Sequence, residues 1–217
     1  GAGNCQKAVN LFAHTMPASY VAVDISVDYL SSHLKDLQAQ FATLDVMGVG
    51  MDFSQSLTFP ESLQHHLASK PVLALYLGSS LGNFNPTDAL QFLQRIASLC
   101  KIGQAGSGLL IGIDLVKAAK TIELAYADDL GVTAAFNLNV LRRINRLLGS
   151  DFDVRDWQHM ACFNTQDSRV EMHLQAKRNL TVSWPGQQRQ FIQGETIHTE
   201  NSYKWTLTGF EDMLKRS

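Results

Sequence analysis

Short apolar runs alternate with longer amphipathic stretches along the first half of the chain. The apolar runs cover Tyr20–Val23, Val46–Met51, Val72–Leu77 and Leu109–Ile113. Each run has the length and composition of a buried strand, whereas the stretches between them, such as Thr87–Ile102, carry apolar residues at helical spacing. Strands that alternate with helices predict an α/β fold with a doubly wound, mainly parallel sheet.

The second half of the chain has a different pattern. Residues 118–129 and 133–148 have the periodicity of helices, and from Trp157 onward the pattern is that of antiparallel strands. The clearest strand is Arg169–Lys177, in which apolar residues face one way and polar residues the other. We therefore expect an α+β module at 118–204, inserted into a sheet domain that comprises residues 1–117 and 205–217.

Two further expectations follow from this division. An insertion at the carboxyl edge of a parallel sheet lies over the ligand crevice, so the module is a natural substrate-binding part. The sequence Thr208–Glu211 fits a capping box, which predicts that the last helix begins there.

Chemically useful residues stand where the predicted strands end. Asp24, Asp52 and Asp114 each follow a strand, and Gly78 follows the remaining one. Asp24 lies 21 residues after Gly3 of a Gly-Ala-Gly turn, and this spacing is typical of nucleotide sites in which the carboxylate accepts ribose hydroxyls. The third glycine of that pattern is absent, and an acid after a strand can also cap a helix, so the spacing alone leaves both interpretations open.

Composition narrows the classes of function. The net charge is −2 without a basic tract, which gives no support for a nucleic-acid or anionic-membrane partner, and no apolar run reaches membrane-spanning length. Three cysteines without a CxxC motif indicate reduced thiols and a cytoplasmic location. The seven histidines show no metal-ligand spacing, so we expect no metal. Oligomeric state is not indicated.

Several motifs together resemble one known family, the histidine-specific Nα-methyltransferases. They are LGSSLGNFNP (77–86), GIDLVK (112–117), AYADDLGVTAAFNLNVLRRIN (125–145), RVEMHL (169–174) and TENSYKW (199–205). The resemblance implies a Rossmann-like class I methyltransferase fold and S-adenosylmethionine as cofactor. It also implies methylation of the α-amine of L-histidine to its trimethyl betaine, hercynine, in ergothioneine biosynthesis.

The resemblance also assigns residues by position. For the cofactor it implies Gly1, Lys7, Asp24, Asp52, Phe53 and Gly78, and for the substrate Gly78, Asn83, Tyr126, Met172, Glu200 and Ser202. Asn83 and Tyr126 match residues that hold the backbone end of the amino acid, and Glu200 with Ser202 matches the pair that grips the imidazole. No catalytic residue is assigned, because methyl transfer depends on positioning and desolvation. Considered alone, Met172 would be a core residue and Glu200 a solvated strand acid.

The chain also departs from the family. The N-terminal segment with its tyrosines, the first strand and the last two strands of the sheet are missing, so we expect a chain truncated at both ends. That first strand is central in the fold, and its absence would leave the strands that end at Asp24 and Gly78 unpaired in the middle of the sheet. Asn4-Cys5 replaces the small hydroxyl pair of the first turn.

Alternatives remain open at this point. Within the family, the substrate could be another amino acid or amine, and one relative methylates an indole amino acid. A nicotinamide-dependent oxidoreductase would share the Gly turn and Asp24, but the sequence offers no Tyr-x-x-x-Lys pair for hydride transfer. An inactive truncated fragment that binds ligand weakly is the third hypothesis.

Overall fold

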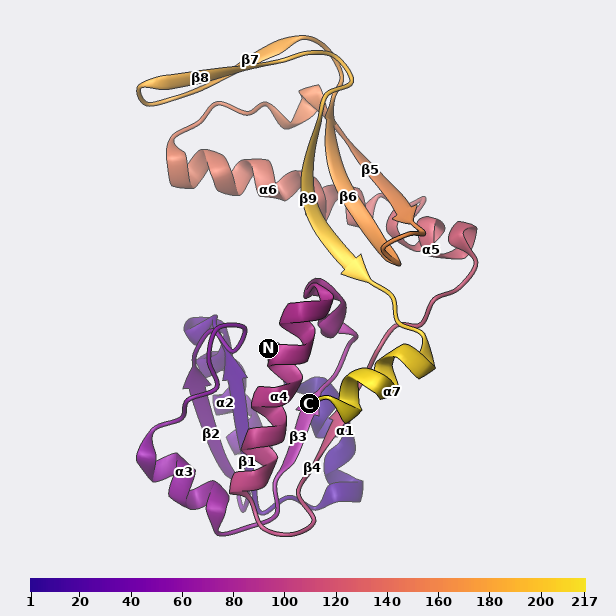
Figure 1. Cartoon of the computed structure of the whole chain (residues 1–217). Coiled ribbons are helices and arrows are strands. Elements are labelled where there is room, and N and C mark those ends of the chain that lie inside the picture. The colour runs from indigo at the N-terminus through magenta and orange to yellow at the C-terminus, as the bar shows by residue number, and fades with distance from the viewer. The chain divides into compact units, whose positions relative to one another are not determined.

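The structure, a computed structural model, describes all 217 residues and forms two compact units (Figure 1). The first unit comprises residues 1–80, 87–112 and 212–217, and the second comprises 81–86 and 113–211. The predicted division into a cofactor domain and an inserted substrate module remains a functional proposal. None of the helices is both long and apolar enough to cross a lipid bilayer.

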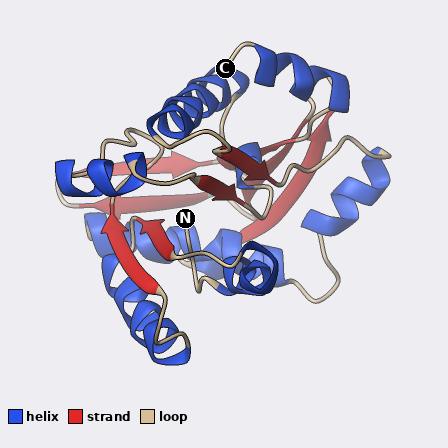
Figure 2. Cartoon of the chain, turned by 90° about the horizontal axis from the view of Figure 1, so that it is seen from below, coloured by secondary structure: helices blue, strands red, loops and turns tan.

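Helices and strands alternate through the first unit, as the hydrophobic pattern predicts (Figure 2). In chain order its elements are α1 (Gln6–Thr15), β1 (Ser19–Asp24), α2 (Val27–Gln40), β2 (Asp45–Gly50), α3 (Glu61–Ala68), β3 (Leu73–Tyr76), the 3-10 turn η1 (Ser80–Asn83), α4 (Pro86–Ile102) and β4 (Gly108–Ile111). The positions of all four predicted strands are confirmed to within one or two residues. The expected burial is wrong for β2 and β4, in which no residue is fully buried. β1 pairs with β2 and β3 with β4, and both pairs are parallel, as expected for an α/β fold.

Side chains alternate between two apolar layers, one on each face of the strands. Ala22 of β1 packs with Phe12 of α1 and Leu30 of α2. On the other face, Tyr76 of β3 contacts Phe92 of α4, with ring centroids 4.6 Å apart. Figure 1 shows α4 in front of these strands and α2 behind them. Helices therefore pack on both sides of these strands.

The gap predicted between the strands that end at Asp24 and Gly78 is present in this structure. β1–β2 and β3–β4 form two separate two-stranded sheets, because no strand hydrogen-bonds to both β1 and β3. At the edge of β1, the backbone N–H of Ala2 donates to the carbonyl of Val23 at 2.9 Å. The Gly-Ala-Gly turn is thereby fixed against the carboxyl end of β1.

The second unit combines two helices with antiparallel strands. Its elements are α5 (Ala119–Tyr126), α6 (Val132–Leu148), the short turn η2 (Val154–Asp156), β5 (Trp157–Asn164), β6 (Arg169–Ala176), β7 (Leu180–Trp184), β8 (Gln187–Phe191) and β9 (Thr196–Tyr203). β6 lies between β5 and β9 in a three-stranded sheet, and β7 with β8 forms a separate hairpin. The alternation expected for β6 is confirmed, because Val170, Met172, Leu174 and Ala176 are all buried.

The core of this unit lies between α6 and the sheet. Leu141 of α6 packs with Trp157 of β5 and Leu174 of β6, all nearly inaccessible to solvent. One buried amide crosses the same core: Asn137 Nδ2 donates to the carbonyl of His173 at 3.1 Å and to His159 Nδ1 at 2.9 Å. A buried polar group must find such partners, so this amide fixes the helix relative to the strands.

The last helix, α7 (Leu207–Lys215), begins earlier than the capping box predicted. The hydroxyl of Thr206, not that of Thr208, accepts the N–H of Gly209 at 3.1 Å. The predicted start at Thr208 is therefore wrong. Thr206 precedes the helix and can use its side chain as a cap, whereas Thr208 lies inside the first turn.

Candidate functional site

Asp24, the last residue of β1, is surrounded by backbone of the first turn. Its Oδ2 accepts the N–H of Gly3 at 3.1 Å and its Oδ1 accepts the N–H of Ser26 at 3.0 Å. A Cβ on Gly1 would lie 2.8 Å from Oδ2, so a larger residue there would displace the Asp24 carboxylate. Burial opposes ionisation, but the backbone donors of Ser26 and Gly3 prevail and lower the pKa of Asp24. Each carboxylate oxygen keeps a second lone pair for a ligand hydroxyl.

The two predicted residues after β2 are Asp52 and Phe53, and Phe53 lies near the Asp24 carboxylate. The Phe53 ring comes within 3.7 Å of the position of a Gly1 Cβ, and its centroid is 6.0 Å from that of Tyr76. Asp52 accepts the backbone N–H of Ser54 at 3.0 Å, which holds the turn after β2. The structure thus brings together Gly1, Asp24 and Phe53.

Gly78 and Lys7 form a second close pair in the same unit. Gly78 has φ +81°, a left-handed conformation that favours glycine. A Cβ at this position would lie 2.5 Å from Lys7 Nζ, so the ammonium group rests directly against the turn after β3. Both residues carried a cofactor assignment from the sequence, and the structure places them in contact.

Substrate candidates of the second unit meet where β9 ends. The Tyr126 hydroxyl donates to Ser202 Oγ at 2.7 Å, although 76 residues separate them. Lys204 Nζ donates to the Tyr126 hydroxyl at 2.8 Å and to Ser202 Oγ at 2.9 Å, and forms an ion pair with Asp114 at 3.1 Å. Below, these four residues are called the hydroxyl hub.

The sequence pattern does not single out Lys204 or pair it with Asp114. In the sequence, Asp114 is an acid at the end of a strand and Lys204 is part of the TENSYKW motif. The available signal was spacing, because Lys204 lies two residues after Ser202 in an extended segment and so can point the same way. Burial opposes ionisation of Asp114, but hydrogen bonds from Lys117 and Lys204 lower its pKa. Asp114 therefore remains an anion opposite Lys204.

Glu200 and Met172 share a face of the sheet with Ser202. Glu200 lies opposite Met172 and Ser202 opposite Val170 in the β6–β9 pairing, so all four side chains point to the side of the buried β6 residues. The register shifts between Met172 and His173, an irregularity that can redirect neighbouring side chains. Glu200 is half-buried, and this burial raises its pKa.

Asn83 occupies the end of η1, next to the hub. A Cβ on its neighbour Gly82 would lie 2.7 Å from the Tyr203 carbonyl and 3.4 Å from Ser202 Oγ. The turn that carries the exposed Asn83 therefore lies against the end of β9. Asn83, Tyr126, Met172, Glu200 and Ser202 all belong to the second unit, whereas Gly78 belongs to the first.

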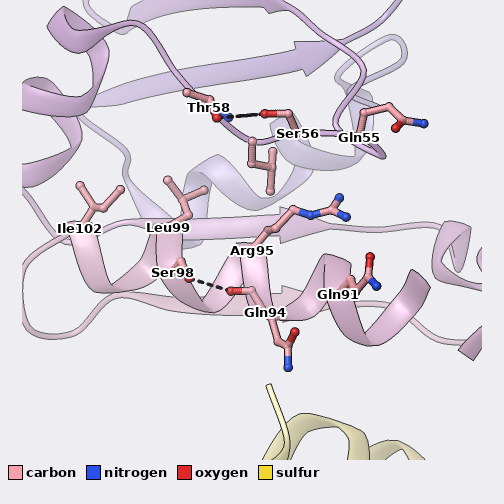
Figure 3. Close-up of a pocket in the computed structure, with 10 residues that line it drawn as sticks. Gln55, Ser56, Thr58, Gln91, Gln94, Arg95, Ser98, Leu99 and Ile102 are labelled. Carbon is pink, nitrogen blue, oxygen red and sulfur yellow. Dashed lines mark hydrogen bonds between the residues drawn. The ribbon is translucent and has the colours of Figure 1, made fainter. Parts of the chain in front are cut away.

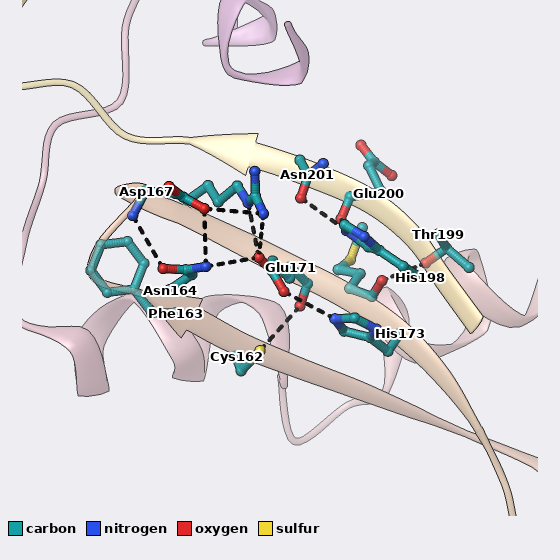
Figure 4. Close-up of polar contacts among 12 residues, drawn as sticks. Cys162, Phe163, Asn164, Asp167, Glu171, His173, His198, Thr199, Glu200 and Asn201 are labelled. Carbon is teal, nitrogen blue, oxygen red and sulfur yellow. Dashed lines mark hydrogen bonds and ion pairs between the residues drawn. The ribbon is translucent and has the colours of Figure 1, made fainter. Parts of the chain in front are cut away.

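The opposite face of the β5–β6–β9 sheet carries a polar cluster (Figure 4). Cys162, Glu171 and His173 offer ligand atoms within 4.8 Å of one another. However, Glu171 Oε1 already accepts from Asn164 at 3.0 Å and from Arg169 Nε at 2.9 Å, and these bonds lower the pKa of Glu171 to about 2. Because a guanidinium neutralises this carboxylate, we assign no metal to the cluster.

A hollow of about 450 Å³ lies between α4 and the segment 55–58 (Figure 3). Its walls are mostly amides, hydroxyls and aliphatic side chains, and none of the predicted site residues lines it. The one charged wall residue, Arg95, donates to the Ser54 carbonyl at 2.5 Å. The hollow lacks the convergent titratable groups of an active site, so we place no function there.

Comparison with known proteins identifies the class to which this fold and these residues belong. The family model described as histidine-specific, SAM-dependent methyltransferase matches residues 1–217. The chain therefore belongs to the histidine-specific, SAM-dependent methyltransferase family.

Individual relatives agree with this assignment. A histidine N-alpha-methyltransferase of Mycobacterium tuberculosis is 36% identical over 189 residues, which cover 86% of this chain and 56% of the relative. The N-methyltransferase fsqC of Aspergillus fumigatus is 30% identical, covering 100% and 59%. Ergothioneine biosynthesis protein 1 of Schizosaccharomyces pombe is 29% identical, covering 85% and 24%. The chain thus spans little more than half the length of the first two relatives.

Proposed function

We propose that the chain binds S-adenosylmethionine through the first unit and L-histidine through the second, and methylates the α-amine of histidine. Three successive transfers, each of which leaves S-adenosylhomocysteine, with loss of a proton from the nitrogen after the first and after the second, would give Nα-trimethylhistidine, hercynine, the betaine from which ergothioneine is made. Membership of a SAM-dependent, histidine-specific family supports the reaction class. The observation that supports histidine as the substrate is the placement of Glu200 and Ser202 on one face of the sheet. Glu200 offers an acceptor, and the Ser202 hydroxyl lies beside that of Tyr126.

The residues of the first unit fit the cofactor. Gly1 and Gly78 carry no side chain and lie against Asp24 and Lys7, so a ligand held by these two groups can approach the backbone closely at both turns. The ionised Asp24 offers free lone pairs for the two hydroxyls of a ribose. Phe53 supplies a flat apolar surface for the adenine, and Asp52 precedes it in sequence at the same turn.

The residues of the second unit fit an amino acid with an imidazole ring. A neutral imidazole has one N–H donor and one bare nitrogen acceptor. The Glu200 carboxylate can accept from the first and the Ser202 hydroxyl can donate to the second. Asn83 and Tyr126 can hold the backbone end of the amino acid, and the buried Met172 contributes an apolar wall next to Glu200.

The cofactor supplies a methyl group on a sulfonium, which makes the methyl carbon electrophilic without a metal ion. The role of the chain is then to orient the amine lone pair in line with that carbon and to exclude water. The neutral form of the amine is the nucleophile, so the site must hold the amine by hydrogen bonds rather than by an ion pair. No side chain has to form a covalent bond, in agreement with the absence of an assigned catalytic residue.

Calorimetric titration of this 217-residue chain with S-adenosylhomocysteine, followed by L-histidine, tests the proposal. We expect the chain to bind both ligands, with histidine binding more tightly once the cofactor product is present. Mass spectrometry after incubation with S-adenosylmethionine should then detect histidine with one to three added methyl groups. Binding of S-adenosylhomocysteine without binding of histidine would refute histidine as the substrate. Methylation of a different amine would identify another specificity within the family.

A further inference from the structure

Lys204 is the only cationic side chain of the hydroxyl hub, and each hydrogen of its ammonium group has a partner. Its side chain is 2% exposed. The three N–H groups of an ammonium point to three acceptors: Asp114 at 3.1 Å, the Tyr126 hydroxyl at 2.8 Å and Ser202 Oγ at 2.9 Å. Lys204 therefore has no hydrogen left for a substrate, and it can act on a ligand only through its partners.

The consequence for Ser202 concerns the direction of its hydrogen bond. A hydroxyl oxygen has two lone pairs and one hydrogen. Both lone pairs of Ser202 Oγ are used, one by Lys204 and one by the Tyr126 hydroxyl. The only remaining capacity of Ser202 is its own O–H, which makes it a donor toward any group that approaches.

Glu200 supplies the opposite polarity two residues earlier on the same face. Its carboxylate accepts hydrogen bonds when ionised, so the two side chains present one donor and one acceptor. A ring that satisfies both must contain a bare nitrogen and an N–H group. An indole has only the N–H group, and a thiophene ring has neither.

We propose that Lys204 is a positioning residue that fixes Ser202 as a hydrogen-bond donor and so makes the site selective for a neutral imidazole. This inference rests on the proposed histidine methylation and adds the residue that sets its ring specificity. Asp114 supports this arrangement, because its carboxylate holds the Lys204 ammonium group in place and balances its charge. Without Lys204, the Ser202 hydroxyl could reorient, and its donor direction would be lost.

The test compares two amino acids of similar shape, L-histidine and L-β-(2-thienyl)alanine. Lys204→Met keeps the aliphatic stem without the donors, Lys204→Arg keeps the charge and donors, and Lys215→Met is the control at an exposed lysine. For Lys204→Met we expect kcat/KM for histidine to fall about tenfold to a hundredfold, with little change for thienylalanine. S-adenosylhomocysteine should bind as before, Lys204→Arg should recover part of the preference, and Lys215→Met should match the unsubstituted chain.

A purely structural role would give a different result, because both amino acids would then lose activity in the same proportion. Equal losses would overturn the inference. Combining Lys204→Met with Ser202→Ala gives a second criterion: the double variant should be no worse with histidine than Ser202→Ala alone, and additive losses would contradict the coupling.

A measurement on the unsubstituted chain covers the case in which Lys204→Met fails to fold. Nitrogen-15 NMR of ring-labelled histidine, bound together with S-adenosylhomocysteine, reports the protonation of both ring nitrogens. We expect a neutral ring with one protonated nitrogen and one that accepts a hydrogen bond. An imidazolium with two protonated nitrogens would refute the donor role of Ser202. If no histidine binds at all, the proposed function fails first, whereas histidine binding as an imidazolium removes only this inference.

Discussion

Glu200 lies directly opposite Met172 in the β6–β9 pairing, half-buried and on the same face as Ser202. A carboxylate in this position lowers stability at neutral pH, because burial raises its pKa above the ordinary value of 4.5. Folding therefore favours its protonated form. The contribution to stability is present below the ordinary pKa and is lost as pH rises through the folded pKa.

Glu200→Gln should consequently stabilise the chain at neutral pH while abolishing histidine binding. We expect a higher melting temperature than the unsubstituted chain at pH 7, and a difference that shrinks toward pH 4, where Glu200 itself becomes protonated. Thermal melts across this pH range measure the effect, with Glu211→Gln as a control at an exposed glutamate. A stabilisation that does not vary with pH, or histidine affinity that survives, would contradict this role.

Asp24→Asn should weaken cofactor binding without removing the turn. The amide keeps one acceptor oxygen but loses the charge and the second acceptor that two ribose hydroxyls require. We expect the dissociation constant of S-adenosylhomocysteine to rise about tenfold or more, which corresponds to roughly 1.4 kcal/mol. Calorimetry measures it, and Asp28→Asn on the exposed side of α2 is the matched control. An unchanged constant would remove the ribose assignment.

Gly78→Ala should reduce both the stability of the chain and its affinity for the cofactor. Gly78 and Gly106 have similar positive φ angles, +81° and +94°, but only Gly78 lies against another group, Lys7 Nζ. Both alanine variants should lose about 1 kcal/mol from strain, and Gly78→Ala should additionally weaken S-adenosylhomocysteine binding. Chemical denaturation and calorimetry separate the two effects. Equal cofactor affinity in both variants would show that the Lys7–Gly78 contact does not shape the site.

Asn137→Ala should destabilise the second unit and disturb Tyr126. Asn137 is 1% exposed, and it donates to His159 Nδ1, whose Nε2 bonds the Tyr126 carbonyl at 2.8 Å. Losing this buried amide should cost about 1–3 kcal/mol. Asn139→Ala, at an exposed site on the same helix, controls for helix propensity and should change stability little. Histidine affinity should fall for Asn137→Ala alone, and the same fall in both variants would argue against this support of Tyr126.

The sequence determined the elements, because their signals are local. The apolar run at Val46–Met51 and the alternation along Arg169–Lys177 depend only on residues a few positions apart, and both became strands. The second strand also has the predicted buried face. The spacing from Gly3 to Asp24 is also visible in the sequence, and in the structure the N–H of Gly3 donates to Asp24 Oδ2 at 3.1 Å. Family motifs then extended these patterns to individual site residues.

Only the tertiary structure decided how distant segments meet. Strand pairing depends on which backbone edges face each other, and here β1 pairs with β2 and β3 with β4 in two separate parallel sheets. The hydroxyl hub joins Asp114, Tyr126, Ser202 and Lys204 across as many as 90 residues of sequence. In sequence Lys204 is an ordinary lysine, and its role arises from burial, which leaves its ammonium group no water and makes each of its three protein partners necessary.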